Sequence, residues 1–377
     1  MSNAIYMDAN ATTPPCAAAQ AAMEAALRTV GNPSSVHGFG RAARALVDRA
    51  RAQVARLVGA SPQDVIFVAG GTEANNLALA SCGDRPLIVS GIEHDSVLKP
   101  AQMAGARILR TERNGQVDLT DLAEALREAG RPALVSIMLA NNETGVIQPV
   151  CAAADLAHEA GGLLHCDAAQ APGRISLDMN DLCTDMLSVS AHKIGGVVGT
   201  GALVVKGDLA VKPLLIGGGQ EKFRRAGTEN VPAIAAFGAA AEEAQSCAQA
   251  SRVAALRDRL ERKLDGLDAR ITVLGGESPR LPNTSCLAVA GKSSETLVMA
   301  LDLAGYAISA GSACSSGKVR PSHVASAMGY GEDIARSAIR VSLGWWNSEA
   351  EIDGLAARLA NLIGGKERTL SDMQPAA

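Results

Sequence analysis

The sequence predicts an α/β protein: a large unit with a mostly parallel, seven-stranded sheet flanked by helices, and a smaller α+β unit at the C-terminal end. From about residue 40, helical patterns alternate with short apolar segments, which is typical of a parallel sheet covered on both faces. The 377 residues exceed the needs of one small core and suit two domains. The composition, 47% apolar and 20% charged, is that of a soluble globular chain.

The large unit is predicted to alternate helices and strands from its first long helix onward. Residues 41–58 form that helix, and Gly59 ends it. Its apolar stripe consists of Val47, Ala50, Val54 and Leu57. A strand at 65–68 runs through Gly70-Gly71-Thr72 into a helix that reaches Leu79. The other expected strands are residues 87–89, 107–109, 134–139, 163–166, 186–189 and 202–205.

The smaller unit follows a long alanine-rich helical region at 232–264, which we expect to bridge the two units. Its predicted strands are residues 271–273, 287–289 and 339–341. The last helix opens with the capping-box sequence Ser348-Glu349-Ala350-Glu351 and closes near Gly364.

Composition and charge exclude several classes of protein. The apolar stretches are too short to span a membrane, and the N-terminus lacks a signal sequence. A net charge of −4 and 2% aromatic residues argue against a nucleic-acid partner. None of the eight cysteines has C-x-x-C spacing, so we expect no metal site and reduced thiols in a cytoplasmic protein.

A lysine and an aspartate at two strand ends indicate a pyridoxal phosphate (PLP) site. Lys193 follows the strand at 186–189, and a partly desolvated lysine there can act as an amine nucleophile. Asp167 ends the strand at 163–166, and PLP requires a lysine for its aldehyde and an acid for its pyridine nitrogen. Gly71 and Thr72 at a helix start, with Ser190, could bind the phosphate, although an ordinary strand–helix turn explains the glycines equally well.

Three further residues have both a functional and a plain interpretation. His94 is either a loop histidine without a role or a residue that stacks on a flat ring and moves protons. Cys314 lies among small polar residues near Lys318, so it is either an incidental thiol or a nucleophile. Arg340 could hold a carboxylate with two hydrogen bonds or lie on the surface.

Several segments, in order along residues 5–364, together resemble the motifs of the cysteine desulfurase family. They are residues 6–13 (YMDANATT), 31–37 (GNPSSVH), 71–76 (GTEANN), 93–94 (EH), 141–146 (NNETGV), 167–170 (DAAQ), 190–193 (SAHK), 225–230 (RAGTEN), the loop around Cys314 and 339–342 (IRVS). Residues 311–316 (GSACSS) resemble the NifS/IscS-like branch.

The resemblance implies a PLP-dependent homodimer of the aspartate-aminotransferase fold (fold type I) with shared active sites. It implies a large PLP-binding domain at 14–248 and a small domain formed by 1–13 and 249–377, whose loop 309–321 carries the catalytic cysteine. The resemblance implies that Lys193 is the Schiff-base lysine, Asp167 the pyridinium partner and His94 the ring-stacking acid/base. It implies a phosphate site formed by Gly71, Thr72, Ser190 and His192 together with Thr228 of the other subunit. It further implies that Asn142 and Gln170 face the cofactor O3′ side and the substrate, that Arg340 binds the substrate carboxylate, and that Cys314 is the sulfur acceptor.

The implied reaction converts L-cysteine to L-alanine and leaves a persulfide on Cys314. The sulfur would pass to an acceptor or iron–sulfur scaffold protein, and Cys314 could contact a transferred iron–sulfur cluster. The chain departs from the family at Val197-Val198 and in a short C-terminal tail, which leaves the acceptor open. A selenocysteine lyase or another PLP aminotransferase would fit Lys193 and Asp167 as well, and an inactive sulfur carrier is a third possibility.

Overall fold

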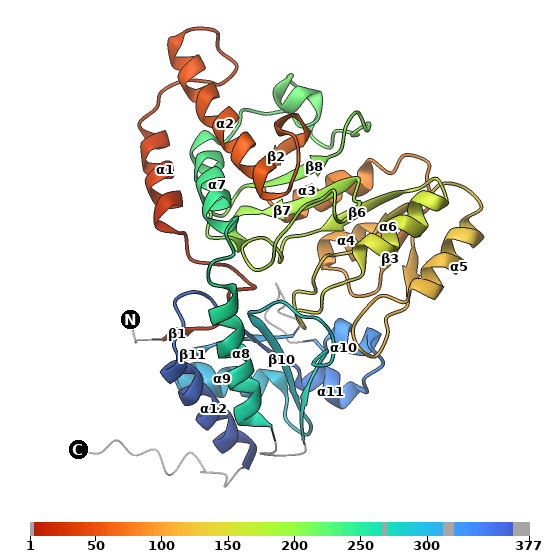
Figure 1. Cartoon of the computed structure of the whole chain (residues 1–377), viewed down its shortest axis with the longest axis vertical. Coiled ribbons are helices and arrows are strands. Elements are labelled where there is room, and N and C mark those ends of the chain that lie inside the picture. The colour runs from red at the N-terminus through yellow and green to blue at the C-terminus, as the bar shows by residue number, and fades with distance from the viewer. Residues whose placement is uncertain (1–3, 266–269, 312–319, 365–377) are drawn as a thin grey trace.

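The computed structural model describes residues 4–265, 270–311 and 320–364 and contains two main sheets, each with its own helices. Figure 1 shows the larger sheet in the upper part of the molecule and the smaller one below it. Within the described residues, no helix has the length and apolar character needed to cross a membrane.

The large sheet has seven strands in the order β2-β8-β7-β6-β5-β3-β4. The strands are β2 (Val65–Val68), β3 (Leu87–Ser90), β4 (Arg107–Leu109), β5 (Leu134–Ser136), β6 (Leu163–Asp167), β7 (Met186–Ser190) and β8 (Gly201–Val205). Only β8 runs against its neighbours β2 and β7, which confirms the mostly parallel seven-stranded sheet. The predicted strand at 134–139 is shorter, because beyond Ser136 the chain leaves the ladder with β3.

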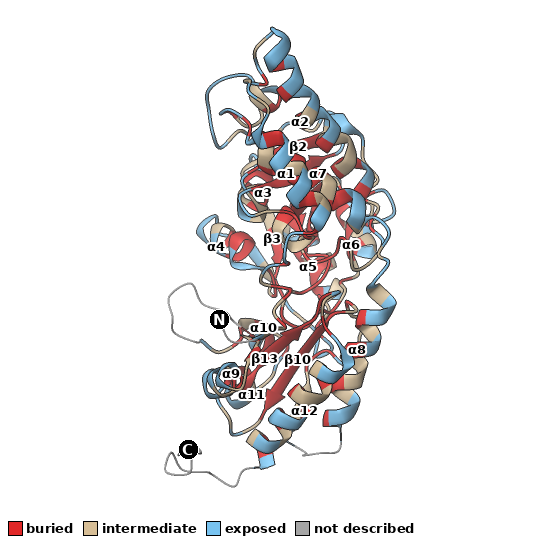
Figure 2. Cartoon of the chain, turned by 90° about the vertical axis from the view of Figure 1, so that its left-hand side faces the viewer, coloured by how far each residue is buried: buried red, intermediate tan, exposed pale blue. Residues whose placement is uncertain are grey.

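Helices cover both faces of this sheet, as the alternation along the chain predicts. One face packs on α2 (Gly38–Leu57), α5 (Leu119–Ala129), α6 (Val150–Glu159) and α7 (Val231–Ala244). The other face packs on α3 (Gly71–Ala80) and α4 (Asp95–Met103). Helix α1 (Ala17–Leu27) packs on α7, and short 3-10 turns lie at Pro62–Asp64, Ala191–Lys193 and Gln220–Phe223. In Figure 2 the strands are buried and the outer helix faces are exposed.

The small sheet is antiparallel and has its own core. Its strand order is β12-β13-β10-β9, and a separate parallel pair joins β1 to β11. The strands are β1 (Ile5–Tyr6), β9 (Ile271–Val273), β10 (Thr284–Val289), β11 (Tyr306–Ala307), β12 (Ser309–Ala310) and β13 (Ile339–Ser342). Its helices are α8 (Ala250–Leu264), α9 (Ser294–Leu303), α10 (His323–Ala327), α11 (Glu332–Ser337) and α12 (Glu349–Gly364).

The N-terminal segment and residues after 250 share one apolar core. Met7 packs in the cluster that contains Leu260, Val341 and Leu355. The capping box predicted for α12 is present, because Ser348 N donates to Glu351 Oε2 at 2.8 Å and Glu351 N to Ser348 Oγ at 3.4 Å. The domain boundaries at 14 and 248 stay a prediction.

The helical region predicted at 232–264 consists of two helices. Helix α7 ends at Ala244, α8 starts at Ala250, and Cys247 between them has a left-handed φ of 47°. The two helices bury different surfaces: α7 is buried on most sides against α1 and α2, whereas α8 packs one apolar stripe on the small core. A continuous helix would not let each half reach its own core.

Candidate active site

The predicted site residues of the large unit gather at the carboxyl edge of the large sheet. Asp167 ends β6, Ser190 ends β7, and His94 follows shortly after β3. Lys193 closes the 3-10 turn after β7, and Gly71 opens α3 after β2. Because β2, β3, β6 and β7 run in the same direction, all these groups emerge at one edge, where ligands of open α/β sheets bind.

Lys193 is an amine held in a site that disfavours its charge. Its Nζ donates to the carbonyl oxygens of Asn10 and, at 2.9 Å, Ala11. Burial, followed by the positive charges of Arg340 and Arg174, lowers the pKa of Lys193 to about 7. A large share of this side chain is therefore a neutral amine near pH 7, which is the form a nucleophile or proton acceptor needs.

Asp167 belongs to a buried network that also orients His94. Asp167 Oδ1 accepts from Ala169 N at 2.9 Å, and its Oδ2 accepts from Asn75 Nδ2 at 2.7 Å. Asn75 Nδ2 also donates to Ser96 Oγ at 2.8 Å, and that hydroxyl lies 2.8 Å from His94 Nδ1. The network fixes the direction of the Asp167 carboxylate.

The ring of His94 is held as a helix cap. Its Nδ1 accepts the backbone N–H of Ser96 at 3.1 Å, so the proton of the neutral ring sits on Nε2. Burial lowers the pKa of His94, and the charge of Asp167 opposes that shift. His94 is therefore mainly neutral at pH 7, with Nε2–H as its available donor.

The predicted phosphate end contains a buried hydroxyl without a partner. Among the described residues, Ser190 Oγ is buried and makes no hydrogen bond. A Cβ on Gly71 would lie 3.4 Å from Ser190 Cβ, so the start of α3 faces this hydroxyl closely. Burial and the charge of Lys193 lower the pKa of His192 to about 4, which leaves a neutral imidazole 3.2 Å from Thr12 Oγ1. The orphaned hydroxyl beside a helix N-terminus fits the phosphate of PLP, as the amine of Lys193 fits its aldehyde.

The small sheet contributes Arg340, which the structure places inside the protein. Arg340 is 3% exposed, which excludes the surface interpretation. Its guanidinium donates to Asp8 Oδ1 at 2.6 Å and to the carbonyl oxygen of Asn142 at 3.1 Å. Its Nε is one of the buried polar atoms without a partner in the described part of the chain. Arg340 therefore keeps a donor available for an anionic ligand.

Asn10, which sequence reasoning did not single out, connects these groups. Its side chain donates to the carbonyl oxygen of Asn142 at 3.0 Å and to Thr284 Oγ1 at 2.9 Å. Its carbonyl oxygen accepts from Gln170 Nε2 at 3.1 Å and from Lys193. Gln170 Oε1 in turn accepts from Arg174. Asn10 lies within the 6–13 motif, and that motif was the one signal in the sequence that could have drawn attention to this residue.

Glu143 is a second residue that sequence reasoning left without a role. Its carboxylate is 2% exposed, and its Oε2 accepts from Ser322 Oγ at 2.5 Å. Its Oε1 lies 3.8 Å from His323 Nδ1, and a Cβ on Gly311 would meet Oε2 at 2.7 Å. Glu143 thus contacts the chain on both sides of residues 312–319, and burial raises its pKa.

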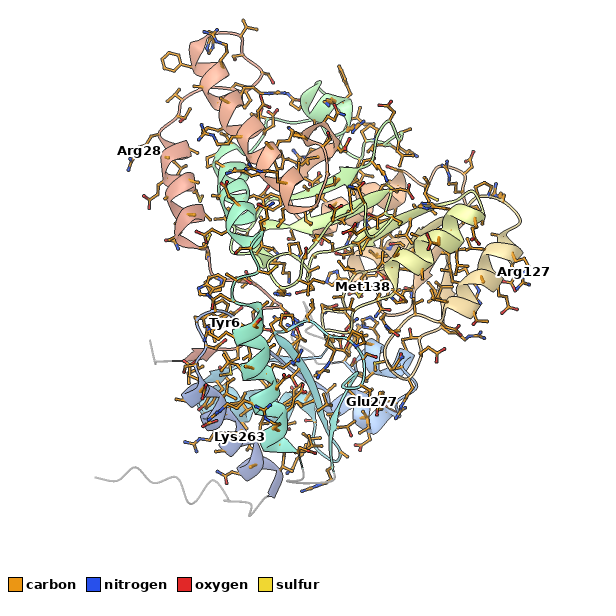
Figure 3. The ribbon with its side chains drawn as sticks, viewed as in Figure 1. Tyr6, Arg28, Arg127, Met138, Lys263 and Glu277 are labelled. Atoms are coloured by element: carbon orange, nitrogen blue, oxygen red, sulfur yellow. The ribbon has the colours of Figure 1, made fainter. Side chains whose placement is uncertain are left out.

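Glu93 completes the set of buried acids between the two sheets. Its Oε1 accepts from Met138 N at 2.7 Å, and Figure 3 labels Met138 at the lower margin of the large-sheet elements. Burial raises the pKa of Glu93 well above its usual range. The carbonyl oxygen of Glu93 lies 3.1 Å from His323 Nε2, which ties α10 to the His94 loop. His165, in contrast, is a core residue bonded to Ser136 and Ser188.

Two predicted site residues remain. Cys314 lies outside the described residues. Thr228 is exposed, and an ion pair of 2.9 Å between Arg225 and Glu73 ties its loop to the first turn of α3. A cavity of about 680 Å³ opens beside Lys193 toward Arg174 and Trp345, but its walls do not include Asp167, Ser190 or His94. This cavity is therefore not the space between Lys193, Asp167 and Ser190 that would hold PLP.

Comparisons with known proteins agree with this geometry over nearly the whole chain. Residues 5–355 match the family described as aminotransferase class-V. A cysteine desulfurase of Cereibacter sphaeroides is 42% identical over 373 residues, 95% of each chain. The cysteine desulfurase IscS of Dictyoglomus turgidum is 38% identical over 385 residues, 98% of this chain and 97% of the relative.

The solved structure of a NifS-like protein from Rickettsia africae superimposes with a TM-score of 0.87 at 33% identity, covering 94% of this chain and 98% of the other. The resemblance of the motifs is thereby confirmed. The chain belongs to the class-V aminotransferases and, within them, to the cysteine desulfurase family of the NifS/IscS-like branch.

Proposed function

We propose that this chain is a PLP-dependent cysteine desulfurase that converts L-cysteine to L-alanine. The sulfur of the substrate goes to Cys314. The C–S bond of the substrate breaks and an S–S bond to Cys314 forms, so the CH2–SH group of the substrate becomes a methyl group and the Cys314 thiol becomes a persulfide. The observation that carries the proposal is Lys193, a buried amine with a pKa of about 7 at the edge where Asp167 and the unpaired Ser190 hydroxyl also lie.

The chain offers a holder for each part of the cofactor. Ser190, Thr72 and His192 would bind the phosphate, Asp167 the pyridine nitrogen, and Lys193 the aldehyde carbon. When bound, PLP supplies an electron sink for the negative charge that develops at the substrate Cα. Asp167 is suited to its role because Asn75 and Ala169 N already aim both carboxylate oxygens.

The remaining residues bind substrate and move protons. Arg340 would bind the substrate carboxylate through its unpaired Nε, while Asp8 keeps the guanidinium in place. Lys193 Nζ, neutral near pH 7, would accept the proton of the substrate Cα. His94, neutral and protonated on Nε2, would stack on the cofactor ring and donate a proton.

The other cysteines support Cys314 as the sulfur acceptor. Burial raises the pKa of several described thiols, which makes them poor thiolates at neutral pH. They are Cys16, Cys82, Cys166, Cys247 and Cys286. The cysteines within the described residues are also free thiols, which supports a reducing, cytoplasmic location.

We further propose a homodimer in which Thr228 reaches the phosphate site of the other subunit. Large apolar side chains are exposed at Phe39 (67%), Ile216 (88%) and Phe223 (75%), and exposed apolar surface of this kind indicates an interface. Thr228 itself is exposed, as a residue that serves a partner subunit would be. A separate sulfur-acceptor or iron–sulfur scaffold protein would then receive the persulfide sulfur.

The deciding experiment incubates the PLP-loaded protein with L-cysteine and measures alanine, sulfide and the mass of each cysteine peptide. We expect alanine, a mass increase of one sulfur atom on the Cys314 peptide, and sulfide once a reducing thiol is added. Cys314→Ser should retain the visible spectrum of bound PLP but release almost no sulfide, because a hydroxyl is far less ionised than a thiol at neutral pH. Formation of a keto acid without alanine would identify an aminotransferase, and turnover of L-selenocysteine alone a selenocysteine lyase.

A further inference from the structure

Two cysteines and an aspartate meet between helix α6 and the turn that precedes β7. Cys151 lies in the first turn of α6, and Cys183 lies in the turn that leads into β7. Cys183 precedes β7, whose carboxyl end leads to the site, and the cluster includes none of the residues that fit PLP. The cluster therefore has no part in the chemistry proposed above.

The three side chains converge although they come from two separate segments. The sulfur atoms of Cys151 and Cys183 lie 3.5 Å apart, 32 positions apart in the chain. Asp155 follows Cys151 by one helical turn on α6, and the two thiols and its carboxylate have ligand atoms within 4.8 Å of one another. Cys183 holds a left-handed φ of 54°, a conformation that a cysteine rarely adopts.

The surroundings of the two thiols favour a positive ion. The Asp155 carboxylate lies beside the two thiols, whose sulfur atoms are 3.5 Å apart. His158, farther along α6, is engaged by Asp185 at 2.8 Å. Negative or potentially negative groups thus gather around Cys151, and a cation would relieve their repulsion.

We propose that Cys151, Cys183 and Asp155 form a binding site for one borderline-soft divalent cation, with Zn²⁺ as its probe. Two thiolates and one carboxylate oxygen would supply three ligands, and water the fourth. Zn–S bonds of about 2.3 Å in a tetrahedral site separate two sulfurs by roughly 3.8 Å, close to the separation in this protein. Binding replaces two thiol protons, so it releases two protons and weakens as the pH falls.

The experiment uses the full PLP-loaded chain carrying Cys314→Ser, so that the Cys314 thiol cannot bind the metal. The protein is equilibrated with Zn²⁺, and the bound metal is measured by mass spectrometry of the digested sample. We expect one more zinc per chain than in the same protein with Cys183→Ser. With Co²⁺, absorption bands from thiolate-to-cobalt charge transfer should appear in the parent and be absent from the Cys183→Ser protein.

Cys247→Ser is the matched control, because Cys247 is also half-buried with a left-handed φ of 47° but belongs to no such cluster among the described residues. The Cys247→Ser protein should retain the zinc.

Should Cys183→Ser fail to fold, Asp155→Asn at an exposed position replaces it, and we expect its affinity for Zn²⁺ to fall at least about tenfold. Equal zinc content in the parent and in the folded cluster variants would overturn the proposal. So would a Cys151–Cys183 disulfide, found by peptide mapping, that forms while the reduced protein binds no zinc.

Discussion

The two sides of the active site are built on different principles. On the large-sheet side, Lys193 has only carbonyl partners and Ser190 Oγ has no partner among the described residues. On the small-sheet side, Arg340 already has the carboxylate of Asp8 and keeps only its Nε without a partner among the described residues. The first side lacks partners that a ligand can supply, whereas the second side holds a charge that is already paired.

This difference explains why the two cations behave differently. Lys193 is half-buried and forms no ion pair among the described residues, so its charged form is costly and its pKa falls. Arg340 is more deeply buried, and its charge is paired with the Asp8 carboxylate at 2.6 Å. One site thus combines a reactive amine with a guanidinium whose charge is already paired.

The largest effect should come from removing the unpaired amine. We expect Lys193→Ala to reduce the rate of alanine formation by about 10⁴-fold, because no other amine in the described site can accept the Cα proton. The initial rate with saturating PLP and L-cysteine measures it, and circular dichroism confirms the fold. A loss below about tenfold would assign the proton transfer to another group.

Breaking the paired side should instead cost stability. We expect Asp8→Ala to lower the free energy of unfolding by about 3–5 kcal/mol, because it leaves the Arg340 charge buried and unpaired. Denaturant unfolding of the PLP-free chain measures the change. The control is Asp48→Ala, whose exposed pair with Arg44 on α2 should contribute less than about 1 kcal/mol. Equal losses for the two variants would contradict the contrast between the sides.

A smaller effect is expected when Asp167 keeps its shape but loses its charge. Asp167→Asn should slow alanine formation by at least about tenfold, or 1.4 kcal/mol of barrier, because a neutral amide does not keep the pyridine nitrogen protonated. The rate at saturating PLP measures it, and the visible spectrum reports whether the cofactor is still bound. If PLP binds and the rate is unchanged, Asp167 has only a structural role.

The smallest effect concerns the stability of the PLP-free protein as the pH changes. Lys193 has a pKa of about 7 when folded and 10.5 as a free side chain, so the unfolded chain binds more protons between these values. The cost that burying the charged amine adds to the free energy of folding is therefore full below pH 7, and it falls as the pH rises toward 10.5. Lys193→Met removes the penalty and should raise the Tm by about 2–4 °C at pH 7, with a smaller gain at pH 9.5. A gain that does not change with pH would refute the lowered pKa.

The sequence predicted most elements of the large sheet and the chemistry of its edge. The strands at 65–68, 186–189 and 202–205 are visible because each is a short apolar run next to glycines or polar residues. The break between α7 and α8 was missed, because residues 245–249 contain neither glycine nor proline. The left-handed turn at Cys247 arises from the need of each helix to reach its own core.

The roles of Asn10 and Glu143 could not be derived from residue type. Each lies inside a motif, but asparagine and glutamate are common in loops and carry no signal of burial by themselves. Asn10 bonds to Thr284, 274 positions away, and Glu143 to Ser322, 179 positions away. Such contacts depend on how the two sheets face each other.

The sequence alone therefore determined the class of fold and the family and named the groups that we propose as reactive, because strand periodicity and motif order are local properties of the chain. Only the tertiary structure decided the state of those groups. Burial lowers the pKa of Lys193 to about 7, and the Asp8 carboxylate pairs with the Arg340 guanidinium from 332 positions away in the chain. That cost depends on distances across the folded protein, which the order of residues does not display.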